Sequence, residues 1–258
     1  MVKGLYTAYT GMIIEQKKMD RLTNNLANAD TNGFKKEGLT ATSFADQLAY
    51  RIKDTSSALI PRGIGDITFG AKVGETYIDW SIGSFDVTDN MHDFAIEGNG
   101  FFRISYTDKQ GQTSVKYTRD GAFAVDRDGV FRTKDGDYVL NQAGGRITID
   151  PNQPFSIDGQ RNIIQNGQIV GNIGVVDIAD YNFLQEFGEN MYDLVEGGQE
   201  VATDTAVIQG ALEKSNMNVV DEMVEMITVS RAYEANQKVI QAVDGTIEKA
   251  VTQVGKVG

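Results

Sequence analysis

The chain has 258 residues, of which 41% are hydrophobic and 23% charged, so it can form one or two folded domains and is not disordered. Its formal net charge of −12 argues against a nucleic-acid partner, because phosphate binding needs clustered lysine and arginine. The absence of cysteine excludes disulfides and thiolate metal sites. We expect neither a membrane span nor a signal peptide, because no run of about 18 apolar residues occurs and the first residues lack the pattern of a secretory signal.

The first 28 or so residues are predicted to form an amphipathic helix. Apolar residues recur there at seven-residue spacing, at Leu5, Met12, Met19 and Leu26. Asparagines crowd the end of this helix at Asn24, Asn25 and Asn28, where their amides can bind a neighbouring backbone. Asn32-Gly33 then predicts the turn that ends the helix.

The next forty residues are harder to assign. Residues 41–53 could form a short helix with Phe44, Leu48 and Ile52 on one side. From Asp54 to Gly74 serine, proline and glycine indicate an extended, loop-like segment. Loops of this length in compact domains are usually functional or linkers. We therefore expect residues 34–74 to be a linker, and the part from Asp54 to Gly70 to contact other subunits.

From about Lys72 to Leu194 the apolar period changes to two. Pairs such as Phe94 and Ile96, or Phe102 and Ile104, alternate with polar residues, and Val115 and Tyr117 follow the same pattern. Turn dipeptides separate them at Asn99-Gly100, Asp120-Gly121, Asp128-Gly129, Asp135-Gly136, Asp158-Gly159 and Asn166-Gly167. This spacing predicts an antiparallel all-β domain, either a sandwich or an irregular barrel.

A returning strand at Val207 to Leu212 is predicted to precede a second, longer helix from Val219 to about residue 254. Asn218 offers the N-cap, and Asp221 and Glu222 suit the first turn. So long a helix needs a partner along its length, and Ser230, Gln237 and Asp244 interrupt its apolar stripe every seventh residue. We predict an assembly seam formed by both helices: Leu5, Met12, Met19, Leu26, Met223, Met226, Tyr233, Ile240, Ile247 and Val251.

The sequence is poor in catalytic groups. His92 is the only histidine, so within one chain neither a histidine triad nor a two-histidine metal site can form. Asp126, Asp128, Asp135 and Asp137 lack the pattern of a known calcium loop, and no phosphate-binding loop is present. We expect a protein that is not an enzyme, with no catalytic, metal or cofactor site and no small-molecule substrate. A carboxylate pair of the glycosidase type stays an alternative.

Several motifs resemble those of the bacterial flagellar rod and hook proteins. Asn24-Asn25-Leu26-Ala27-Asn28 through Thr31-Asn32-Gly33-Phe34-Lys35 is similar to the family's N-terminal signature. Leu212-Glu213-Lys214-Ser215-Asn216 and Ser230-Arg231-Ala232-Tyr233-Glu234-Ala235-Asn236 are similar to its C-terminal signature, and Tyr117-Thr118-Arg119-Asp120-Gly121 to a β-domain motif. The motif residues taken as candidate sites are Asn25, Leu26, Ala27, Asn28, Gly33, Phe34, Ser215, Asn216, Arg231, Ala232, Tyr233 and Glu234.

The resemblance implies a structural subunit of the flagellar basal-body rod. Such subunits are exported by the flagellar type III apparatus and polymerise with themselves and with other rod and hook proteins outside the inner membrane. The product is a hollow tube that transmits torque. In this picture residues 1–33 and 215–258 pair as a coiled coil, and residues 75–214 form an outer β domain.

Length and the segment after Phe44 resemble the distal rod members, while Asp244-Gly245 inside the last helix and the longer tail depart from them. Alternatives are a proximal rod subunit, a secreted β-rich carbohydrate-active enzyme and a coiled-coil adhesin.

Overall fold

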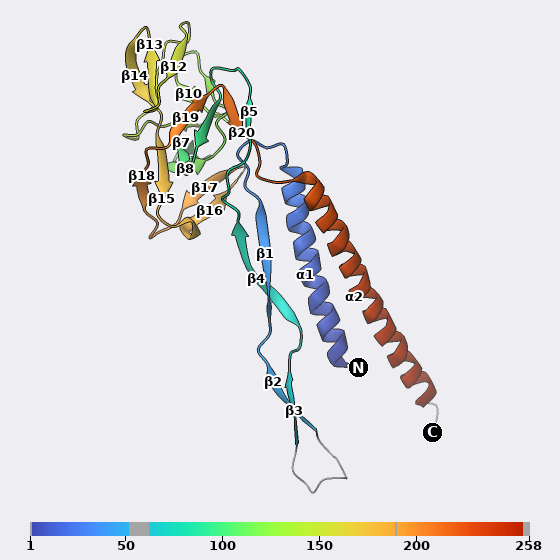
Figure 1. The fold of residues 1–258 in the computed structure, drawn as a ribbon. Coiled ribbons are helices and arrows are strands. Elements are labelled where there is room, and N and C mark those ends of the chain that lie inside the picture. The colour runs from blue at the N-terminus through green and yellow to red at the C-terminus, as the bar shows by residue number, and fades with distance from the viewer. Residues whose placement is uncertain (1, 52–61, 189, 255–258) are drawn as a thin grey trace. The chain divides into compact units, whose positions relative to one another are not determined.

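The computed structural model describes residues 2–51, 62–188 and 190–254 (Figure 1). The protein is mainly β, with two long helices, α1 (Val2–Ala27) and α2 (Val219–Val254). It divides into two compact units. We call the described residues within 1–27, 37–79 and 218–258 the helical unit, and those within 28–36 and 80–217 the β unit. The expected class, mainly β with terminal helices, is confirmed.

In the helical unit α1 and α2 lie side by side (Figure 1). Two contacts set their direction: Asn25 binds Glu222, and Gly11 faces Asn236, whose Nδ2 would lie 3.1 Å from a Cβ added at Gly11. From the first contact to the second, the position moves back by 14 residues along α1 and forward by 14 residues along α2. The helices are therefore antiparallel. The 36 residues of α2 span about 54 Å at 1.5 Å per residue.

The predicted start of α2 is confirmed. The Asn218 side-chain oxygen accepts a hydrogen bond from the Val220 N–H at 3.0 Å, which satisfies one of the amides that a helix leaves free at its N-terminus. Asp221 and Glu222 lie in the first turn, where the helix dipole favours negative charge.

The short helix predicted at residues 41–53 is wrong for the part that the structure describes. Glu37–Ser43 forms β1 and Gln47–Arg51 forms β2, which pair antiparallel with β4 (Ala71–Ile78) and β3 (Arg62–Ile67). The helical spacing of Phe44 and Leu48 was a weak signal that strand pairing overrides. Residues 62–67, expected to be loop-like, form a strand despite two glycines. Residues 52–61 of the expected contact segment lie outside the described residues.

The β unit contains a nine-stranded antiparallel sheet within the described residues. Its order is β16-β17-β8-β7-β11-β10-β9, and β15 pairs with both β7 and β18. The strands are β7 (Phe101–Thr107), β8 (Thr113–Thr118), β9 (Ala124–Val125), β10 (Phe131–Arg132), β11 (Tyr138–Val139), β15 (Val175–Ile178), β16 (Leu184–Phe187), β17 (Met191–Leu194) and β18 (Glu200–Ala202).

Smaller sheets complete this unit. β12 (Phe155–Ile157), β13 (Asn162–Gln165) and β14 (Gln168–Asn172) form one; β6 (Phe94–Glu97) pairs with β19 (Ala206–Gln209), and β5 (Phe85–Val87) with β20 (Ala211–Glu213). A single 3-10 turn, η1 (Tyr181–Phe183), precedes β16. The predicted turn at Asn166-Gly167 joins β13 to β14 with φ of 51° and 76°, as a tight hairpin requires.

The core of the β unit consists of the residues that alternate in the sequence. Phe94, Ile96, Phe102 and Ile104 are at most 1% exposed and belong to one hydrophobic cluster. The alternation fails on β8, where Val115 is exposed and Lys116 is buried. Because β8 lies between β7 and β17, Lys116 can reach Asp193 at 2.7 Å and lie over the Phe187 ring.

Candidate functional site

A buried asparagine joins three segments of the helical unit. The Asn25 Nδ2 donates to the Glu37 carbonyl at 3.0 Å and to the Glu222 carboxylate at 3.1 Å, and its Oδ1 accepts from the Glu37 N–H at 3.0 Å. These bonds tie the end of α1 to the start of β1 and to the first turn of α2. Arg21 also pairs with the Glu37 carboxylate. We call Arg21, Asn25, Glu37 and Glu222 the Asn25 cluster.

The Asn25 cluster explains why an amide is needed at this position. Asn25 is 0% exposed, Glu222 1% and Glu37 5%, so two carboxylates lie close to a fully buried side chain. Buried polar groups are costly unless hydrogen-bonded, and the uncharged amide supplies the two N–H donors and the acceptor that these three bonds use. The cluster therefore fixes the register of the two helices at the end near the chain's terminal motifs.

We predict that Asn25→Asp destabilises the protein by about 3 kcal/mol at pH 7, because it adds a third buried carboxylate. In the unfolded chain the introduced carboxyl has a pKa of about 4, whereas burial beside two carboxylates raises its pKa in the folded protein. The loss of stability relative to the wild type should therefore be small below about pH 4 and grow as the pH rises. Urea unfolding of both proteins across this range measures it.

The matched control is Gln16→Asp, which places the same charge at an exposed position of the same helix. Its cost should stay below about 1 kcal/mol, as for surface charges. Equal, pH-independent losses from both substitutions would show that the buried amide has no special role.

The β unit holds a second buried cluster, which sequence reasoning missed. Lys35 Nζ lies 2.6 Å from one oxygen of Glu213, and Arg119 donates to the other at 3.1 Å. All three side chains are at most 2% exposed. Lys35 also donates to the Ser81 carbonyl at 2.7 Å, and the Gly83 N–H donates to Glu213 at 3.0 Å. We call Lys35, Arg119 and Glu213 the Glu213 cluster.

Each member of the Glu213 cluster comes from a different sequence motif. Gly33 brings the N-terminal motif into place: its N–H donates to the Glu213 carbonyl at 2.7 Å, its φ is +68°, and an added Cβ would lie 2.5 Å from the Arg119 backbone. Asn216 accepts from the Lys36 N–H at 2.9 Å and donates to Ser81. The N-terminal, β-domain and C-terminal motifs therefore meet here.

The other motif residues take varied positions. Phe34 is buried; Ser215 is buried, and its hydroxyl has no hydrogen-bond partner among the described residues. Leu26 and Asn28 are half-buried and Ala27 is exposed, with Asn28 Oδ1 accepting from Thr31. In α2, Ala232 and Tyr233 are half-buried, whereas Arg231 and Glu234 are exposed.

The structure also shows which face of α2 turns towards α1. Less exposed positions recur in steps of four and three at Glu222, Met226, Val229, Tyr233, Asn236, Ile240, Val243 and Ile247, and Ser230, Ala232 and Gly245 beside them are also half-buried. Of the predicted seam, Met226, Tyr233, Ile240 and Ile247 lie on this face, and Leu5, Met12, Met19 and Leu26 are half-buried in α1. Met223 and Val251 are exposed. Among the described side chains of the two helices, the buried apolar ones are Ala8, Ile14, Leu22 and Val229.

Of the three polar residues predicted to interrupt the stripe, Ser230 is half-buried, whereas Gln237 and Asp244 are exposed in the single chain. The polar groups on the contact face are Glu222, bonded to Asn25, and Asn236, which lies against Gly11. The predicted row at Met226, Tyr233, Ile240 and Ile247 lies on this face, but the places of Glu222 and Asn236 on it could not be predicted without the partner helix.

An exposed apolar patch covers the first three turns of α2. Val220, Val224 and Ile227 are 66%, 59% and 54% exposed, and Val219 and Met223 are 37% and 49% exposed. At about 100° per residue the five fall within about 140° of arc, centred roughly 130° round the helix from the face that meets α1. We call them the α2 patch. Arg231 and Glu234 continue on the same side.

Among the described residues no group of three or more histidine, cysteine or acidic side chains is placed to hold a metal ion. Asp126, one of the four aspartates considered for calcium, instead pairs with Arg132 at 2.6 Å. No helix in the described part of the chain combines the length and apolar character of a membrane span.

The fold combines two long paired helices with a β-rich unit, and the terminal sequence motifs meet in buried polar clusters. Both ends of the chain therefore take part in packing. Three family descriptions match it: "Flagella basal body rod protein" at residues 5–35, "Flagellar hook protein FlgE/F/G D1 domain" at 95–171 and "Flagellar basal body rod FlgEFG protein C-terminal" at 208–253. The chain belongs to the flagellar basal-body rod family, whose members are structural proteins.

Curated relatives match over almost the whole chain. The flagellar basal-body rod protein FlgG of Bacillus subtilis is 34% identical, covering 97% of this chain and 98% of its own length. The rod protein FlgF of Caulobacter vibrioides and the hook-basal body complex protein FlhO of B. subtilis are each 31% identical and covered in full. The protein is thus a rod subunit of the flagellar basal body.

Proposed function

We propose that this subunit polymerises with copies of itself, and with other rod and hook proteins, into a hollow helical tube that transmits torque from motor to hook. Export by the flagellar type III apparatus would deliver it beyond the inner membrane. The observation that carries the proposal is the α2 patch. Its five side chains expose a contiguous apolar surface on a helix whose other face is already packed, and such surfaces mark sites of protein association.

Within the tube, residues 1–33 and 215–258 would form the inner layer, with α1 and α2 paired as a coiled coil. The four- and three-residue steps of the contact face on α2 support this pairing, since they are the period of knobs-into-holes packing. Residues 75–214 would form the outer wall. The segment 34–74 would reach a neighbouring subunit, as the long paired strands β1 and β4 allow.

We further propose the distal rod position, supported by 34% identity to the B. subtilis FlgG, with the proximal position as the alternative because FlgF relatives match at 31%. Basal bodies from a strain lacking the protein distinguish the two positions. A shortened rod that keeps its base supports the distal one, and a rod missing from its base supports the proximal one.

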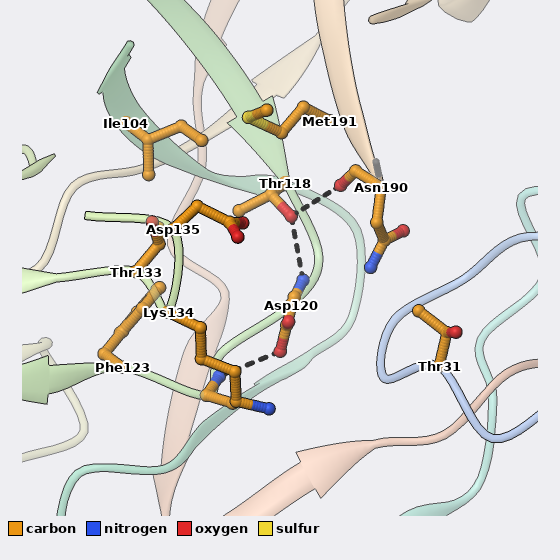
Figure 2. A pocket seen from close by; sticks show the side chains of 11 residues that line it. Thr31, Ile104, Thr118, Asp120, Phe123, Thr133, Lys134, Asp135, Asn190 and Met191 are labelled. Atoms are coloured by element: carbon orange, nitrogen blue, oxygen red, sulfur yellow. Dashed lines mark hydrogen bonds between the residues drawn. The ribbon is translucent and has the colours of Figure 1, made fainter. Parts of the chain in front are cut away.

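A structural role without catalysis fits the small size of a cavity that is lined by described residues of the β unit (Figure 2). Its volume is about 200 Å³, smaller than the roughly 300–1,000 Å³ of small-molecule sites. A glycosidase would need two free carboxylates across a sugar-sized cleft. Asp120 and Asp135 line this cavity, but Lys134 acts on Asp120 with positive charge, which disfavours such a role for this cavity.

The test of the proposal is Val224→Asp, which puts a charge in the centre of the α2 patch. Because Val224 is 59% exposed in the single chain, the monomer should unfold within about 0.5 kcal/mol of the wild type. Burial of that charge between subunits would cost several kcal/mol per contact, so tubes should no longer form. Electron microscopy of the full chain after concentration, and motility of the strain, measure the effect.

Gln237→Asp is the control, since it adds the same charge to an exposed polar position of the same helix. It should leave assembly intact. Normal tubes from the Val224→Asp protein would remove the α2 patch from the proposal, and small closed oligomers of the wild type would favour the adhesin alternative.

A further inference from the structure

Two methionines are exposed among the side chains that the structure describes. Met223 in α2 is 49% exposed, and Met91, which follows β5, is 46% exposed. The other described methionines are half-buried: Met12, Met19, Met191, Met217 and Met226. The chain has no cysteine, so the methionine thioethers are the sulfur groups that an oxidant can attack. Exposure therefore predicts that Met223 and Met91 react first.

Met223 lies in the middle of the α2 patch. Side chains three and four positions apart are neighbours on a helix. Val219 and Val220 therefore adjoin Met223 on one side, and Ile227 adjoins it on the other. All three are exposed, at 37%, 66% and 54%. Met91 belongs to the β unit and is no part of this patch, so it provides a comparison for exposure alone.

The thioether of Met223 is not needed for the pairing of the two helices. The preceding residue, Glu222, bonds Asn25 of α1 at 3.1 Å. Successive residues are about 100° apart round a helix, so Met223 lies to the side of that contact. Met226, by contrast, lies on the face that meets α1. A polar change at Met223 should therefore leave the monomer folded.

Oxidation changes the character of the patch at its centre. The sulfur lone pair of a thioether attacks one oxygen of hydrogen peroxide, the O–O bond breaks, and the departing hydroxide takes the remaining proton and leaves as water. Sulfur loses two electrons, and the peroxide gains them. The product, methionine sulfoxide, is polar and carries a hydrogen-bond acceptor. The valine and isoleucine side chains beside it offer no donor, so burial of that oxygen between subunits is costly.

We propose that Met223 is a modification site, and that its oxidation to the sulfoxide by hydrogen peroxide blocks assembly through the α2 patch. The block rests on the proposed function, whereas the reaction itself does not. The free subunit is the vulnerable form, because packing that excludes water from the patch also excludes peroxide. Reduction by a thiol-dependent methionine sulfoxide reductase, which oxidises two thiols to a disulfide and releases water, restores the apolar thioether.

The first experiment measures the reaction on dilute, monomeric full-length protein. The chain is treated with hydrogen peroxide, and peptide mass spectrometry follows the gain of one oxygen at each methionine. We expect Met223 and Met91 to react at least about three times faster than Met226, since susceptibility follows exposure. A Met223 rate no higher than that of Met226 would overturn the site, whether or not the protein assembles.

The second experiment measures assembly by electron microscopy after concentration. The oxidised wild type should need at least about tenfold more protein to form tubes, and treatment with the reductase and dithiothreitol should restore them. Met223→Leu keeps the apolar volume, so it should form tubes both before and after peroxide. Met91→Leu is the matched control and should stay as sensitive to peroxide as the wild type.

Two results would overturn the block. One is equal tube formation by the oxidised and untreated wild type, and the other is an equal loss from oxidised wild type and oxidised Met223→Leu. Met223→Gln gives a second check, because it places a polar amide in the patch without peroxide and should prevent tubes. If the untreated wild type forms no tubes, the proposed function fails and the block with it, while the first experiment still decides the reactivity of Met223.

Discussion

Replacing Glu213 by glutamine is expected to lower the free energy of unfolding by about 3–5 kcal/mol. The substitution keeps the shape of the side chain but leaves Lys35 and Arg119, both at most 2% exposed, without their shared counter-charge. Uncompensated charges in a low-dielectric interior are among the most destabilising changes known for single residues. Calorimetry of the full chain should show a fall of roughly 6–20 °C in the transition of the β unit.

Asp86→Asn is the matched control, because it removes one carboxylate from β5, the strand that pairs with β20. Asp86 pairs with Lys214 at 3.0 Å, and both side chains are about half exposed. Loss of this ion pair should therefore lower the free energy of unfolding by at most about 1 kcal/mol. Combining Glu213→Gln with Lys35→Met should recover part of the lost stability, since one of the stranded cations is then gone. A Glu213→Gln protein as stable as the control would show that the cluster is not a structural determinant.

Ile240→Asp is expected to block assembly of the rod. Ile240 is half-buried on the face of α2 that turns towards α1, so the monomer already loses apolar contact and gains a poorly solvated charge. Truncation of fully buried isoleucines costs about 2–5 kcal/mol, and the half-buried position predicts the low end of that range in the single chain. In a polymer the defect would recur in every subunit. Motility and rods counted in isolated basal bodies measure the effect.

The neighbouring Gln241 supplies the control, because it lies about 100° further round the helix and is exposed. Gln241→Glu adds a negative charge outside the contact face and should be tolerated. The β unit does not contain Ile240, so its thermal transition should be nearly unchanged in both variants. Normal rods from the Ile240→Asp strain would show that the face shared by α1 and α2 is not needed for assembly.

Much of this protein follows from local sequence alone. The apolar periods predicted both terminal helices and the β-rich middle, and Asn218 marked the start of α2, because helix periodicity and capping depend on residues within a few positions. The turn dipeptide Asn166-Gly167 likewise needs only its own backbone preferences. The terminal motifs were sufficient to indicate the flagellar rod family.

The tertiary structure decided what depends on distant partners. The strands β1 to β3 were missed because strand pairing joins residues that a short window cannot relate, such as Glu37 of β1 and Ile78 of β4. The same limit hid the Glu213 cluster, whose Lys35 lies 178 positions from Glu213. The places of Glu222 and Asn236 on the α2 contact face were also out of reach, since they depend on where Asn25 and Gly11 of the other helix meet them. Periodicity can be read from one segment of the sequence. Buried ion pairs and helix register each depend on two segments that are distant in sequence, and only the folded chain brings those two segments together.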